Sequence, residues 1–298
     1  MDIIEKSIFK TLTYFDLLAR PLTLNEVWQN LYRGKANKLV VLLSLRKLIK
    51  KKIVEKNGSY YFLYGRKKIV KNYLLKREIS KKRWQKAYSV INVLKFIPFI
   101  KNVSVINSLS FSNSTDKSDI DILLVTSKNR LWIARAFTVL LLEILNQNKN
   151  KWYQANKFCL GFAFDESRLD FSEIKYKKDI DFTYWLSGLM PVCDRGIYKK
   201  LISQNQWIYQ ELPCWQPKEI ISAPVNKTRL EKILSGAFGD KLENFLAKIQ
   251  INKIWRDPIN RRPGASVIAD SSLMKLHAFD KRKERQSQWE KAIERSLT

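Results

Sequence analysis

The stretch from Val103 to Ser127 reads VSVINSLSFSNSTDKSDIDILLVTS. A short alternating apolar run ends at Asn107-Ser108, and a polar loop follows from Leu109 to Ser118. A second apolar run then begins within the tripeptide Asp119-Ile120-Asp121. This order predicts a strand, a tight turn, a loop, and a second strand with two carboxylates at its start.

The two aspartates are separated by one residue. Side chains alternate along a strand, so we expect Asp119 and Asp121 to leave the same face. Two adjacent carboxylates repel each other and raise each other's pKa unless a cation lies between them. Aspartate oxygens suit Mg²⁺, which takes waters and substrate phosphates as its other ligands. The pair therefore predicts a site for one or two Mg²⁺ ions and phosphoryl transfer.

The turn before the loop carries groups that can bind phosphate. A turn at Asn107-Ser108 presents backbone N–H groups and a hydroxyl, which is how nests in other proteins hold anions. Asn tolerates positive φ better than other non-glycine residues, so it can form such a turn. We expect Asn107, Ser108 and Ser118 to contact a bound nucleotide.

Together these features resemble the signature of the DNA polymerase β-like nucleotidyltransferases, and the resemblance covers residues 98–170. The signature's glycine is replaced here by Asn107. The resemblance implies a Mg²⁺-dependent enzyme that transfers a nucleoside monophosphate from an NTP, ATP being the expected donor, to a hydroxyl acceptor. That acceptor is an RNA end, a protein side chain or a small molecule. The matching positions are Ile106, Ser108, Asp119, Ile120, Asp121 and Ile122.

Members of this family carry a third carboxylate on a neighbouring strand. The apolar run from Phe158 to Phe164 predicts that strand, but it contains no acid. Asp165 stands at its C-terminal end, so we expect Asp165 to complete a catalytic set with Asp119 and Asp121. The alternative is a weak or inactive nucleotidyltransferase fold that acts as a nucleic-acid-binding or regulatory module, alone or with a partner protein.

The first third of the chain predicts a DNA-binding type of domain. Residues 1–65 show three helical segments, a capping box at Thr23 to Glu26, and a hairpin around Asn57-Gly58, which together indicate a winged helix. The third helix would be the one to approach nucleic acid. Its candidate contacts are mostly lysines, which neutralise phosphate rather than read bases. They are Lys38, Arg46, Lys47 and Lys50.

The net charge supports a polyanionic partner. The chain has 55 Lys and Arg against 28 Asp and Glu, a net charge of +27. Residues 1–100 alone carry +17, which favours nucleic acid as a partner. A general lysine bias in composition is the competing interpretation.

The remaining segments complete the prediction of a multidomain protein of the α+β or α/β class. We expect a basic connecting helix at residues 66–97, a nucleotidyltransferase core with a small mixed sheet at 98–175, and a helical C-terminal region at 176–298. Within the core we expect a polar loop from Asn148 to Lys151, and within the C-terminal region a short strand from Ser266 to Ala269. Within that region His277 and Asp280 lie close in sequence, a pairing more typical of a cap or a surface contact than of catalysis.

Composition excludes several classes of protein. The longest apolar run, residues 131–145, contains Arg135 and Glu143, so we expect no membrane span. Three cysteines without CxxC spacing, and no signal peptide, indicate a cytoplasmic protein with reduced thiols. A single histidine excludes a zinc site built from histidines.

Overall fold

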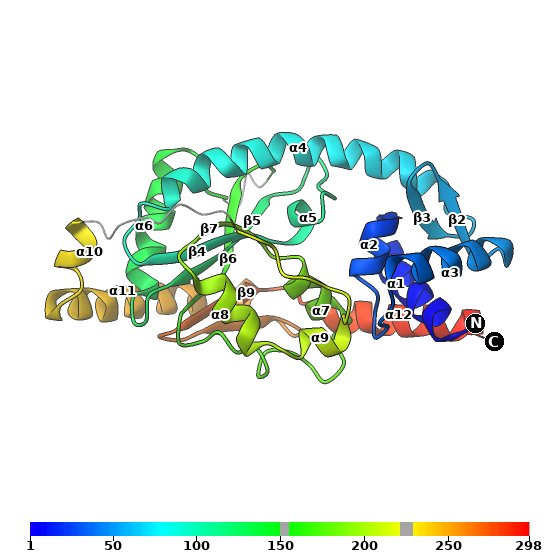
Figure 1. Cartoon of the computed structure of the whole chain (residues 1–298). Coiled ribbons are helices and arrows are strands. Elements are labelled where there is room, and N and C mark those ends of the chain that lie inside the picture. Colours follow the sequence, from blue (N-terminus) through cyan, green and yellow to red (C-terminus); the bar gives the residue numbers. More distant parts are fainter. Residues whose placement is uncertain (150–154, 221–228, 298) are drawn as a thin grey trace.

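The computed structural model describes residues 1–149, 155–220 and 229–297 (Figure 1). Within these ranges the chain is mixed α/β, with one three-stranded and one six-stranded sheet, which confirms the predicted class at that level. No helix of the described ranges is long and apolar enough to cross a membrane.

The N-terminal segments form where the sequence predicts them. Three helices surround the three-stranded sheet, whose strand order is β1-β3-β2 with antiparallel pairing throughout. Thr23 caps the second helix in a reciprocal pair with Glu26, and Gly58 takes φ +57° in the hairpin turn. The elements are α1 (Ile3–Leu17), β1 (Leu22–Thr23), α2 (Leu24–Gln29), α3 (Lys38–Lys50), β2 (Val54–Asn57) and β3 (Tyr60–Leu63).

A long helix, α4 (Lys68–Leu94), connects the two sheets and spans the top of the view in Figure 1. Ala87, Ile91 and Leu94 on this helix are buried against the larger sheet. Arg83 is buried as well, and its guanidinium donates to the carbonyls of Thr115 and Asp116. The connecting helix therefore holds the loop that precedes the aspartate pair.

The larger sheet has the strand order β7-β4-β5-β6-β9-β8. Its centre is the parallel pair β5 and β6, and every other pairing is antiparallel. Full burial on both faces explains the nearly continuous apolar sequences of these two strands. The strands are β4 (Ile100–Val105), β5 (Ile120–Thr126), β6 (Phe158–Asp165), β7 (Met190–Asp194), β8 (Ser266–Ala269) and β9 (Leu273–His277).

Helices cover both faces of this sheet. One face packs against α4, α6 and α11, and the other packs in one continuous core with the N-terminal helices and α7. The last helix returns to the N-terminal region, where the Trp289 indole N–H donates to the Lys10 carbonyl at 2.9 Å. The helices are α5 (Asn107–Ser110), α6 (Leu131–Ile144), α7 (Ile180–Ser187), α8 (Ile197–Gln204), α9 (Ile208–Glu211), α10 (Arg229–Ile233), α11 (Ala237–Arg256), η1 (Pro258–Arg261) and α12 (Arg282–Leu297).

The C-terminal region differs from its prediction. Residues 176–298 were expected to be helical apart from a short strand at Ser266 to Ala269, which forms as β8. They also supply two further strands of the six-stranded sheet, β7 and β9. Pro191 hides β7 from sequence analysis, but β7 is an edge strand, where a proline is tolerated. The loop predicted around residues 148–151 lies partly outside the described residues.

Candidate metal and nucleotide site

The two aspartates lie together at the start of β5, as predicted. Asp119 directly precedes the strand and Asp121 is its second residue. Because β5 and β6 are parallel and Asp121 pairs with Cys159, the start of β6 lies beside them. Ligand atoms of Asp119, Asp121 and Cys159 lie within 4.8 Å of one another, close enough to share a cation. All three side chains are half-buried.

The pair is electrostatically strained. Burial, and then the charge of Asp119, raise the pKa of Asp121 to about 6, although the Asn107 side chain bonded to it works in the opposite direction. Burial and the neighbouring Asp121 raise the pKa of the Cys159 thiol to about 12, so this thiol is protonated at neutral pH. The site thus holds two carboxylates whose charges are only partly compensated.

One lysine supplies part of that compensation. The Lys149 ammonium lies 2.5 Å from Oδ2 of Asp119 and 3.9 Å from Sγ of Cys159. Burial works to lower the pKa of Lys149, but Cys159, Asp119 and Asp121 together raise it above its ordinary value. Lys149 is therefore a protein cation at the place where the sequence predicts a metal ion. Lys149 was not predicted as a site residue, because it lies within the polar loop of residues 148–151, far along the chain from the motif.

The Asn107 turn has the conformation that the sequence predicts. Asn107 takes φ +58°, the left-handed region that Asn tolerates. The Ile106 N–H donates to the Asp121 carbonyl at 3.1 Å, which places the turn directly beside the aspartate pair. Ser108 follows in α5, and its hydroxyl lies 3.5 Å from that of Ser114.

Ser118 is part of the loop rather than of the turn. Its hydroxyl accepts from the Thr115 N–H at 3.0 Å and lies 3.1 Å from the Thr115 hydroxyl. Its backbone carbonyl accepts from the Asn156 N–H at 2.9 Å. Ser118 thus closes the end of the loop next to Asp119, and its contact with a nucleotide remains a prediction.

Asp165 does not join the pair, which corrects the expectation of a third acid there. It is paired with Thr126 at the opposite end of the parallel strands, about 17 Å along β5 from Asp121. Its fully buried carboxylate accepts from the N–H of Asn129 and from the N–H and hydroxyl of Ser167, at 2.5 to 2.9 Å. Asp165 therefore fastens the ends of two strands and their following loops.

Cys159 occupies the position beside Asp121 where we expected a third carboxylate. The sequence contained a signal for it, because parallel strands that start together place their first residues side by side. Aligning the start of the β6 sequence with Asp121 selects Cys159. The prediction considered only acidic residues and therefore selected Asp165, which lies at the opposite end of β6.

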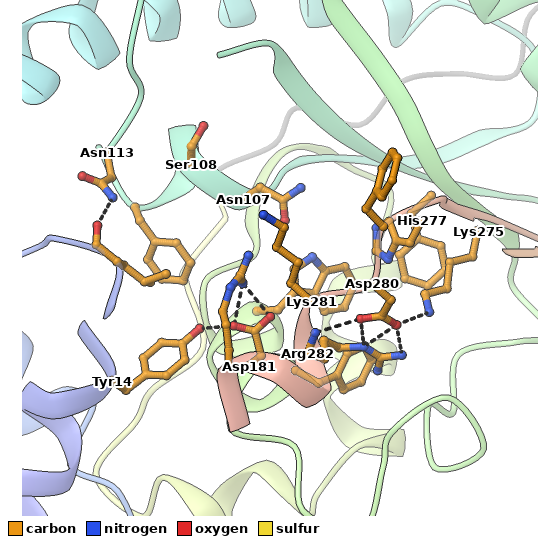
Figure 2. A pocket seen from close by; sticks show the side chains of 17 residues that line it. Tyr14, Asn107, Ser108, Asn113, Asp181, Lys275, His277, Asp280, Lys281 and Arg282 are labelled. Atoms are coloured by element: carbon orange, nitrogen blue, oxygen red, sulfur yellow. Dashed lines mark hydrogen bonds and ion pairs between the residues drawn. The ribbon is translucent and has the colours of Figure 1, made fainter. Parts of the chain in front are cut away.

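A cavity opens next to the turn, on the sheet face that carries Asp121. Its volume is about 380 Å³. Figure 2 shows side chains converging on it from the N-terminal helices, the Asn107 turn, β9 and α12. Its polar lining includes Asn107, Ser108, Lys275, His277 and Lys281, and its apolar lining includes Phe111, Phe162, Phe182, Trp185 and Phe279.

Ion pairs fix part of the cavity wall. Asp181 accepts from the Tyr14 hydroxyl at 2.8 Å and from Arg285 at 2.7 Å, which joins α1, α7 and α12. Asp280 lies between Arg282, at 2.8 Å, and the buried Lys275, at 3.7 Å. Because Asp181 and Asp280 are both held by these partners, the side chains of this cavity wall are fixed before any ligand binds.

His277 also lines the cavity, and it does not pair with Asp280 as a catalytic dyad. Its imidazole makes no hydrogen bond to any residue in the described ranges. Burial, and then the neighbouring Lys275, lower the pKa of His277 to about 4, so its imidazole is neutral near pH 7. The Phe162 and His277 rings are 6.4 Å apart.

The basic residues of α3 are solvent-exposed, and three of them lie at the edge of an apolar groove. Arg46, Lys47 and Lys50 line it together with Ile3 and Leu43, and 77% of the Ile3 side chain is exposed. The fourth candidate contact, Lys38, is also exposed and lies over the Trp28 ring at 5.0 Å. Nucleic-acid binding by this helix remains a prediction.

Comparisons with protein-family models, with curated proteins and with solved structures found no match for this chain.

Proposed function

We propose that the protein is a metal-dependent nucleotidyltransferase built from a winged-helix domain, a nucleotidyltransferase core and a C-terminal segment that completes the core sheet. The observation that supports this most directly is the arrangement of Asp119 and Asp121 beside the left-handed Asn107 turn. Two carboxylates with a partly uncompensated charge suit a divalent cation, and the backbone N–H groups of a left-handed turn suit phosphate.

The donor set fits Mg²⁺ through its carboxylates alone. Asp119 and Asp121 would hold the ion, since Mg²⁺ prefers oxygen ligands, whereas the protonated Cys159 thiol is a poor ligand for it. When bound, the ion neutralises charge that develops on the triphosphate. Lys149 would then release Asp119 and turn to the phosphates, which also attract an ammonium group.

In the proposed reaction the donor is an NTP, and ATP is the first candidate. The triphosphate lies along the Asn107-Ser108 turn. The hydroxyl oxygen of the acceptor forms a bond to the α-phosphorus, the bond from that phosphorus to the bridging oxygen breaks, and pyrophosphate leaves with the electron pair. The hydroxyl proton passes to solvent. Most of the catalytic effect comes from positioning and charge stabilisation.

Incubation with α-labelled ATP, GTP, CTP or UTP, Mg²⁺ and cell extract tests this proposal. Label should appear on a macromolecule or a small acceptor with the wild-type protein and be absent with Asp119→Asn/Asp121→Asn. Asp165→Asn is the matched control, because it removes a carboxylate from the same strand pair outside the site. Equal labelling by the wild type and the Asp119/Asp121 variant would refute the proposal.

A second candidate is a nucleotidyltransferase fold that binds its ligand without catalysis. Cys159 in place of an acid, together with the Lys149–Asp119 ion pair, favours it. Calorimetry separates the two candidates, because this candidate predicts that ATP binds equally well with Mg²⁺ and with EDTA and that no label is transferred.

A further inference from the structure

The cavity beside the Asn107 turn combines aromatic rings with positive charge. Five of its lining residues carry Phe or Trp rings, and Tyr14 adds a sixth aromatic side chain. Four cationic side chains, Lys275, Lys281, Arg282 and Arg285, line it against two acids, Asp181 and Asp280. A flat ring attached to an anionic group matches this lining better than an apolar or a cationic molecule does.

Several polar groups of the lining have no partner within the described part of the chain. The buried Nε1 of Trp185 and the buried Oδ1 of Asn113 make no hydrogen bond there, and leaving such atoms unpaired is costly. The Lys281 ammonium makes no ion pair or hydrogen bond with a described residue. In Figure 2 its side chain extends across the cavity toward Asn107. The cavity therefore offers both donors and an acceptor to a ligand.

We propose that this cavity binds the terminal nucleotide of a single-stranded nucleic acid, which would be the acceptor in the transfer. The role of this nucleotide as the acceptor rests on the proposed function, but its binding to the cavity does not. The base would lie among the rings, and the adjoining phosphate would pair with Lys281. The terminal hydroxyl would point toward the Asn107-Ser108 turn.

Size and position favour an end of a strand over its middle. A volume of about 380 Å³ lies at the lower end of the range of about 300 to 1,000 Å³ typical of small-molecule sites, so it suits one nucleotide rather than several. The wall of Asp181, Arg285 and Tyr14 closes one side. The chain's net charge of +27 favours attraction of the rest of the strand.

The cavity is also distinct from the predicted site of the donor triphosphate. Phosphates of the donor need the cation held by Asp119 and Asp121, whereas neither aspartate lines the cavity. The two sites meet only at Asn107 and Ser108. Binding of the acceptor end should therefore be independent of metal, and binding of the donor should require it.

Fluorescence anisotropy of a short oligoadenylate labelled at its 5′ end, in EDTA and at low salt, tests the proposal, with RNA and DNA forms in separate arms. Phe279 is 65% exposed and Lys281 is exposed as well, so Phe279→Ala/Lys281→Ala should fold normally. We expect this variant to bind at least about tenfold more weakly, the usual effect of losing one stacked base. A circular oligoadenylate, which has no end, should compete at least about tenfold less well than the linear form.

Two matched controls sharpen the test. Phe238 is also 65% exposed. Lys283, in the first turn of α12 and two residues after Lys281, is an exposed lysine that does not line the cavity. Phe238→Ala/Lys283→Ala removes the same groups and should bind like the wild type. Asp119→Asn/Asp121→Asn should keep this binding while losing Mg²⁺-dependent transfer, so failure of the proposed function and failure of this inference give different results.

Several results would overturn the inference. One is equal competition by circular and linear strands, and another is unchanged affinity of Phe279→Ala/Lys281→Ala. A third is loss of binding only when Arg46, Lys47 and Lys50 are replaced. Absence of oligonucleotide binding combined with label transfer to a protein would also overturn it, and would indicate a protein acceptor.

Discussion

The two ends of the β5–β6 strand pair each carry an aspartate, and their surroundings differ. At one end Asp165 is fully buried and accepts hydrogen bonds from two N–H groups and a hydroxyl. At the other end burial and Asp119 raise the pKa of Asp121 to about 6. A satisfied carboxylate fastens the fold, whereas an unsatisfied pair costs stability and is typical of a functional site. The difference supports our proposal that the functional site lies at the Asp121 end of the strand pair.

The largest expected effect is on stability at the Asp165 end. Asp165→Ala removes the fully buried acceptor of three part-buried hydrogen bonds, so we expect it to lower the free energy of unfolding by about 2 to 4 kcal/mol in urea denaturation. Asp170 accepts the same kind of bonds from Ser172 on the surface. Asp170→Ala should cost less than about 0.5 kcal/mol. Equal losses in the two variants would contradict the structural role of Asp165.

A smaller effect is expected when Cys159, which stands where we expected a third acid, is replaced by aspartate. Cys159→Asp adds a third carboxylate beside Asp119 and Asp121, and we expect it to strengthen Mn²⁺ binding about tenfold, or about 1.4 kcal/mol. Cys159→Ser is the control, since it replaces the sulfur atom by oxygen without adding a negative charge. Calorimetric titration with Mn²⁺ measures both. Unchanged affinity in Cys159→Asp would show that position 159 does not face the cation.

The pH dependence of stability should reveal the raised pKa of Asp121. Because the pKa of Asp121 is raised in the folded state, the protein takes up a proton there on folding between about pH 4 and pH 6. The ionised group therefore destabilises the fold above pH 6, and this cost fades as the pH falls. Asp121→Asn should raise Tm at pH 7.5 by at least about 2 °C, with the gain shrinking toward pH 4. A lower Tm at pH 7.5 would refute the assignment of strain to this group.

The smallest effect concerns the N-terminal helices. Replacing Lys38, Arg46, Lys47 and Lys50 by Ala should weaken duplex binding and make it less dependent on salt, because these residues would contact phosphates only. Electrophoretic mobility shifts over a series of salt concentrations measure this. Wild-type affinity and salt dependence in the fourfold variant would exclude α3 as a nucleic-acid contact.

Much of the difference between the two ends of the β5–β6 strand pair could be predicted from the sequence. The period-2 runs, the Asn107 turn and the Asp119–Asp121 spacing place the strands and the turn correctly, because local patterns decide them. Pairing partners far along the chain were not accessible. Nothing local shows that Met190–Asp194 and Leu273–His277 join the same sheet, or that Lys149 turns back to Asp119. The misplacement of Asp165 has the same origin, since its role follows from the direction of β6 relative to β5.

The central claim is that Asp119 and Asp121 exist to hold a cation against a triphosphate. Calorimetry of ATP binding with and without Mg²⁺ tests it most directly, using the wild type, Asp119→Asn/Asp121→Asn and, as the control at the other end of the strands, Asp165→Asn. We predict that Mg²⁺ strengthens ATP binding at least about tenfold in the wild type and in Asp165→Asn, and has no effect in the double variant. Equal binding with Mg²⁺ and with EDTA in all three proteins would contradict the claim.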